Sequence, residues 1–126
     1  MLSVEKVNEF SKDEMVVFLK ANEDYTLFLL GNLEVYGLHL SHEIYSGNYY
    51  VVRDEKGIIA AFSLTKGGTV LIHSQESHSS LFELVLHTCQ KEEIPINGVL
   101  GEWAFCHSFW KFLKEREVIK KEVLVS

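Results

Sequence analysis

The stretch that decides the fold reads Asn48-Tyr-Tyr-Val-Val-Arg-Asp54, Glu55-Lys-Gly57, Ile58-Ile-Ala-Ala-Phe-Ser-Leu-Thr65, Lys66-Gly-Gly68 and Thr69-Val-Leu-Ile-His-Ser74. Three runs rich in β-branched and aromatic residues are separated by two short turns that contain glycine. This pattern predicts a three-stranded antiparallel meander. The middle run, Ile58–Leu64, is apolar on both faces apart from Ser63. We therefore expect this run at the centre of a sheet that is covered on both sides.

Helical patterns flank the meander in the sequence, and three further β-rich runs accompany them. The segments expected outside the meander are a strand over Leu2–Val7, a helix opened by Ser11, a helix over Tyr25–Tyr36, a helix over Ser79–Lys91, a strand over Ile96–Leu100, a helix over Phe105–Lys114 and a strand over Val118–Val125. The helices carry apolar residues at helical spacing. The sequence thus predicts an α+β fold in which helices cover both faces of the sheet.

Local signals mark the ends of the first two helices and the inward faces of all four. Ser11-Lys-Asp-Glu14 has the spacing of a capping box. Asp24 is placed to cap the second helix, and Gly37 suits the left-handed position just past its end. The residues expected to face inward are Met15, Phe18 and Leu19, then Leu27, Leu30 and Leu33 widened by Phe28 and Leu29, then Leu81, Leu84, Val85 and Cys89 beside Phe82 and Leu86, and finally Phe105, Phe109, Phe112 and Leu113.

Length and composition limit the class of protein. A chain of 126 residues is expected to form one domain, residues 1–126. Lys and Arg number 12 and Asp and Glu number 18, giving a net charge of −6 with no basic stripe. Nucleic-acid binding needs a positive face, so we expect none. The sequence shows neither a signal peptide nor an apolar run of the length that spans a membrane. It contains two cysteines, too few for a disulfide framework, which favours a reduced, cytoplasmic protein.

The expected order of elements, β-α-α-β-β-β-α-β-α-β, resembles that of the GNAT superfamily of N-acetyltransferases over nearly the whole chain. The segment Asn22–Leu38 is also similar to the amino-terminal lobe of two-lobed GNAT proteins. The resemblance implies a mixed, mostly antiparallel sheet. It also implies acetyl-CoA as cofactor, a small amine as acceptor, and acyl transfer as the reaction.

The resemblance assigns a cofactor loop to Gln75-Glu-Ser-His-Ser-Ser80. In the family, backbone N–H groups of this loop and the following helix hold the pyrophosphate of coenzyme A. The cofactor-binding candidates here are Gln75, Ser77, Ser79 and Ser80. His78 and Ser80 stand where the family has small residues, and Trp110 stands where it often has the Tyr that protonates the departing thiolate. An indole has no acidic hydroxyl for that role.

Two residues are candidates for acid–base chemistry. His73 ends the last strand of the meander, and Glu102 follows the next expected strand, so both border the opening where this family has its active cleft. The alternative is structural: His73 would be a strand-end residue with a satisfied hydrogen bond, and Glu102 would cap the last helix.

Other clusters favour structural interpretations. His39 and His42 have metal-ligand spacing, but the loop offers too few further ligands, so we expect solvated histidines and no metal. Cys106 and His107 point about 100° apart on a helix and cannot pair with each other. The aromatic set Trp103, Phe105, Phe109, Trp110 and Phe112 should be mostly core, with part of it reaching a surface.

Two functional hypotheses therefore stay open. In the first, the chain is an acetyl-CoA-dependent N-acyltransferase or the amino-terminal part of one. In the second, it is a non-catalytic GNAT-like module for structure, recognition or dimerisation. The apolar strand expected over Val118–Val125 would present an edge to a second copy or to a second GNAT lobe.

Overall fold

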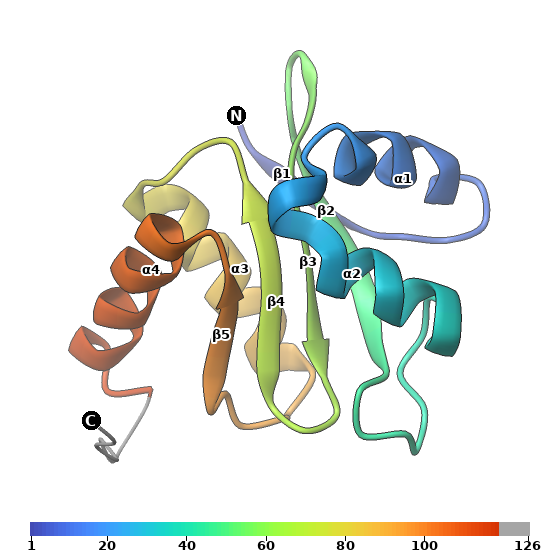
Figure 1. Ribbon diagram of the computed structural model, residues 1–126. Coiled ribbons are helices and arrows are strands. Elements are labelled where there is room, and N and C mark those ends of the chain that lie inside the picture. Colours follow the sequence, from blue (N-terminus) through green and yellow to red (C-terminus); the bar gives the residue numbers. More distant parts are fainter. Residues whose placement is uncertain (119–126) are drawn as a thin grey trace.

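The computed structural model describes residues 1–118, in which five strands form one sheet and four helices cover its two faces (Figure 1). The elements are β1 (Ser3–Lys6), α1 (Lys12–Lys20), α2 (Glu23–Tyr36), β2 (Gly47–Asp54), β3 (Gly57–Thr65), β4 (Thr69–Ser74), α3 (Ser79–Lys91), β5 (Gly98–Gly101) and α4 (Trp103–Glu115). The predicted α+β class and the order of these nine elements are confirmed. The strand expected over Val118–Val125 lies, beyond its first residue, outside the described part.

The meander is confirmed, with β3 as the middle strand of the order β1-β2-β3-β4-β5. Tyr50 of β2 pairs with Phe62 of β3, which in turn pairs with Ile72 of β4, and both ladders are antiparallel. The last pair, β4 with β5, is parallel and runs from Thr69 opposite Gly98 to Ile72 opposite Gly101. The sheet is therefore mixed and mostly antiparallel.

Each face of the sheet has its own apolar core. The core under α3 and α4 includes Val52, Phe62, Ile72, Leu81, Phe82, Val85, Phe109 and Leu113. The core under α1 and α2 includes Met15, Leu19, Leu29, Leu33, Tyr49, Val51, Ala61 and Leu71. Alternation along β2 sends Tyr49 and Val51 to one core and Val52 to the other, because successive strand residues point to opposite faces.

The capping box predicted at Ser11 and Glu14 is wrong. The backbone N–H of Asn8 donates to Ser11 Oγ at 3.1 Å, so the hydroxyl looks backward along the chain. Arg53 on β2 donates from Nη1 and Nη2 to the two carboxylate oxygens of Glu14, at 2.8 Å each, and from Nε to Glu5 at 2.9 Å. A two-pronged charged pair is stronger than the neutral bond that a capping box offers.

Two predictions about α2 are also wrong. The helix begins at Glu23 after the cap residue Asn22, so Asp24 lies inside it. Leu27 and Phe28, expected to face inward, are 64% and 63% exposed. The buried residues of α2 are Thr26, Leu29 and Leu33, which form its inward face. Apolar residues occur all around this helix, so sequence periodicity does not determine which side packs on the sheet.

The remaining boundaries shift by at most two residues, and α3 spans Ser79–Lys91 as predicted. Gly37, expected in the left-handed region, has a φ of 81°, which agrees in sign with the prediction. Strand β5 begins at Gly98 and not at Ile96, although the Ile96 side chain is buried. Helix α4 begins at Trp103, two residues before the predicted start, because Glu102 caps it.

Two glycine substitutions should have opposite effects on stability. A Cβ added at Gly101 would lie 2.2 Å from the Ile72 carbonyl oxygen, so Gly101→Ala should force β5 from β4 and lower the free energy of unfolding by about 1–3 kcal/mol. A Cβ at Gly31 meets nothing within 4 Å in the interior of α2, so Gly31→Ala should raise that free energy by about 1 kcal/mol. Urea denaturation of both variants tests this pair, and equal effects would contradict the described β4–β5 contact.

Candidate functional site

The two acid–base candidates predicted from the sequence lie at the end of the β4–β5 pair where the pairing stops. Pairing between these strands stops at Ile72 and Gly101, and the next residues are His73 and Glu102. The structure therefore brings both candidates to the same end of the sheet, beyond the last paired residues. Helices α1 and α2 cover this end on one side, and α4 begins on the other (Figure 1).

His73 is buried between two aromatic rings. Its side chain is 7% exposed, with the Tyr25 ring stacked at a centroid distance of 6.0 Å and the Phe18 ring tilted at 5.7 Å. Neither imidazole nitrogen has a hydrogen-bond partner among residues 1–118. The structural alternative, a satisfied hydrogen bond, is therefore wrong for the described residues. Nothing in the local sequence indicated that His73 is enclosed by aromatic rings, because Phe18 and Tyr25 belong to two helices that are distant in the chain.

Burial lowers the pKa of His73 below its ordinary value of 6.5, and the negative charge of Glu102 opposes this in part. An imidazolium in an apolar, unpartnered site would lose its hydration without compensation. The histidine is accordingly neutral at pH 7. In that state one of its nitrogens holds a proton and the other can accept one.

Glu102 has the structural role that the sequence offered as its alternative. Its carboxylate accepts the backbone N–H of Ala104 at 3.2 Å and that of Phe105 at 3.0 Å, so it caps α4. A carboxylate at a helix amino terminus is stabilised by the helix dipole as well as by these bonds. Glu102 influences His73 through its charge, while its hydrogen bonds hold it to α4.

The predicted cofactor loop lies between β4 and α3, and its own side chains fill the start of the helix. The backbone N–H of Gln75 donates to the Ile59 carbonyl at 2.9 Å and fixes the loop to the sheet. His78 is the cap residue of α3, and its Nδ1 accepts the N–H of Leu81 at 3.3 Å. Its Nε2 lies 2.7 Å from Glu76 Oε1. The serines at 77, 79 and 80 are exposed on the same loop and first turn.

These contacts oppose a bound pyrophosphate. A phosphate at a helix amino terminus needs free N–H groups and a positive or neutral surround. Here the His78 ring takes the Leu81 N–H, and the Glu76 carboxylate adds negative charge beside it. The neutral tautomer with its proton on Nε2 satisfies both contacts at once, because Nδ1 then accepts and Nε2 donates. The residues of this loop do not fit coenzyme A in the described conformation.

The other sequence candidates are spread over the surface. His39 and His42 are exposed in the loop after α2, and His42 Nε2 lies 3.7 Å from Oε2 of the neighbouring Glu43. Within residues 1–118, no three His, Cys, Asp or Glu side chains form a group that could hold a metal ion. The same part of the chain contains no helix with the length and apolarity required to cross a membrane.

The residues of α4 behave as the spacing predicts. His107 stacks on the exposed Trp103, with centroids 5.0 Å apart, and so does not pair with Cys106. Burial and the charge of Glu102 raise the pKa of the Cys106 thiol to about 11. Trp110 is partly buried against the α3–α4 core. The thiol is protonated at pH 7, which removes it as a nucleophile.

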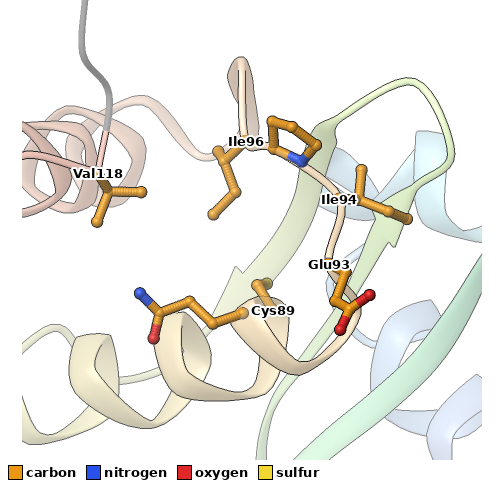
Figure 2. Close-up of a pocket in the computed structure, with 7 residues that line it drawn as sticks. Cys89, Glu93, Ile94, Ile96 and Val118 are labelled. Atoms are coloured by element: carbon orange, nitrogen blue, oxygen red, sulfur yellow. The ribbon is translucent and has the colours of Figure 1, made fainter.

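One pocket of about 240 Å³ lies at the far end of α3 (Figure 2). It is lined by Cys89, Gln90, Glu93, Ile94, Pro95, Ile96 and Val118. Burial raises the pKa of the Cys89 thiol to about 12, so it too stays protonated. Glu93 is the only acidic or basic residue of this lining, and no second group stands beside it for acid–base chemistry. The pocket therefore carries no reaction that the described residues support.

Comparison with known proteins adds no family to this description, because no family model, no curated protein and no solved structure matches the chain.

The buried His73 should make stability depend on pH. In the unfolded chain its pKa is about 6.5, and in the folded chain it is lower. As the pH is lowered through 6.5, the unfolded state therefore binds more protons than the folded state. The free energy of unfolding decreases as the pH is lowered, until the pH reaches the pKa of the folded state. His73→Phe should remove this part of the slope. The control His107→Phe, which removes an exposed imidazole, should keep it.

Urea denaturation between pH 5 and pH 8 measures both slopes. An unchanged slope in the His73→Phe variant would contradict the described burial of this histidine.

Proposed function

We propose that this chain is a lobe of a GNAT-type N-acyltransferase that assists acyl transfer from acetyl-CoA to an amine without binding acetyl-CoA itself. Its part is structural or recognises the acceptor, beside a second lobe that holds the cofactor. One observation carries this proposal: His78 caps α3 with its own side chain, and Glu76 accompanies it. The His78 ring takes one of the N–H groups that a cofactor-binding lobe would offer to phosphate, and the Glu76 carboxylate lies beside it.

The fold supports the GNAT part of the proposal. Two helices precede the meander, a helix crosses from β4 to β5, and these two strands are the parallel pair. Pairing between β4 and β5 ends at Ile72 and Gly101, and α3 and α4 each begin beyond this end of the pair. It accords with the expectation from the resemblance, in which the acceptor and the thioester meet between those strands.

A second candidate function is catalysis by this chain itself, and the observation that favours it is the unpartnered imidazole of His73. A neutral histidine at a strand end can accept the proton that an amine loses during acylation. The ring of Tyr25 covers it, and Tyr25 is itself half exposed, so a modest movement of that ring would uncover the nitrogens. This candidate requires that the loop at Gln75 open for the cofactor.

Thermal unfolding with and without millimolar acetyl-CoA separates the two candidates. A ligand at about 100 times its dissociation constant stabilises a fold by about 2.7 kcal/mol. For a domain of this length that is a rise of about 10 °C in melting temperature. The proposal expects no shift and no heat in a calorimetric titration. A shift of that size would overturn it and favour catalysis by this chain.

Removal of the His78 cap should cost stability. His78→Ala leaves the Leu81 N–H without its side-chain acceptor and should lower the free energy of unfolding by about 1 kcal/mol. His78→Asn, which can cap a helix in the same way, should restore most of the loss. Denaturant unfolding of both variants is the measurement, and equal stability of the Ala variant and the parent would contradict the cap.

A further inference from the structure

Helix α2 has two apolar sides, and only one of them is buried. Leu29 and Leu33 pack on the sheet, while Leu27, Phe28 and Val35 face away from it and are 63–70% exposed. Residues 27, 28, 31 and 35 share one face of a helix, because successive residues turn by about 100°. An apolar residue on every side is typical of a helix that is covered on every side.

One residue of the following loop extends this exposed face. The Asn32 side chain donates to the Tyr45 carbonyl at 3.3 Å, and the rings of Tyr36 and Tyr45 lie 6.3 Å apart. Tyr45, which is 58% exposed, therefore lies beside the carboxyl half of α2. We call the exposed residues Leu27, Phe28, Val35 and Tyr45 the α2 patch.

The α2 patch is large for a surface that stays in water. An aromatic side chain presents about 150–250 Å², so four large side chains at this exposure present on the order of 400 Å². Contiguous apolar surfaces beyond a few hundred Å² mark interaction sites. Two copies of the patch together present on the order of 800 Å², which is the size of a weak interface that forms at high protein concentration.

We propose that the α2 patch is a homodimer interface, in which the α2 helices of two copies pack antiparallel about a two-fold axis near Gly31. Gly31 lies midway between Phe28 and Val35 on the exposed face, and an added Cβ there meets nothing within 4 Å. It leaves a notch in the patch. With the axis there, Phe28 of each copy packs beside Gly31 and Val35 of the other, a contact that repeats itself under two-fold symmetry.

The charges around the patch fit this arrangement. No charged residue occurs between Tyr25 and Leu33, while Glu23, Asp24 and Glu34 lie at the two ends of the helix. The carboxylates would remain at the hydrated rim of the dimer, where like charges repel weakly through water. Added salt should therefore strengthen the dimer, whereas a basic partner of another sequence would bind less tightly in salt. The dimer does not depend on the function proposed above.

Sedimentation velocity across about 1–300 µM chain tests the interface. The parent should dimerise, and Phe28→Glu should raise the dissociation constant at least about 30-fold, as expected for a central aromatic contact. Trp103→Glu is the matched control, because Trp103 is 74% exposed on α4, away from the patch. It should leave the dimer unchanged. Both changes are at exposed positions, and circular dichroism verifies that each variant is folded.

Cross-linking tests the axis. In a Cys106→Ser background, Gly31→Cys should form an intermolecular disulfide on mild oxidation, since residues near the axis meet their own copies within the roughly 7 Å that a disulfide can bridge. Val17→Cys, on α1, should not. A parent that stays monomeric throughout the concentration range, a dimer that survives Phe28→Glu, or one that Trp103→Glu abolishes would each overturn the proposal.

Discussion

The whole structure depends on β3 being buried on both faces. From Ile59 to Thr65 every residue of this strand is buried, so neither side of the sheet can be left to water. The two sides are not equivalent. Phe62 and Leu64 point toward α3 and α4, whereas the smaller Ala61 and Ser63 point toward α1 and α2. Small side chains let a helix layer approach the sheet closely, and the larger aromatic core forms on the other side.

The amino termini of α3 and α4 show a shared feature at the open end of the sheet. Each is capped by a side chain of its own, His78 in one and Glu102 in the other. Helix amino termini are where proteins of many folds bind anions. Here both are occupied from within the chain, and Glu76 and Glu102 add negative charge to the same region. The negative charge at this end of the molecule disfavours a phosphate.

The sequence predicted what depends on short-range pattern. The meander follows from three β-rich runs and two glycine turns, and the burial of β3 follows from a run that is apolar on both faces. The capping role of Glu102 follows from its position before α4. Sequence-based prediction failed where residues distant in the chain compete for the same group. The Glu14 carboxylate binds Arg53, which lies 39 residues away, and does not bond to the start of its own helix. The aromatic enclosure of His73 comes from two other helices and has no local signature. The face of α2 could not be predicted, because its apolar residues point in every direction.

The chain order of the sheet also sets the order in which it can form. Strands β2, β3 and β4 are consecutive and joined by short turns, so their pairing closes small loops at low entropic cost. At one edge, β1 pairs Ser3 with Arg53, about 50 residues away. At the other edge, β5 pairs with β4 only after α3 has connected the two strands. Distant pairings slow folding. We therefore expect the meander to become protected from hydrogen exchange before the two edge strands do.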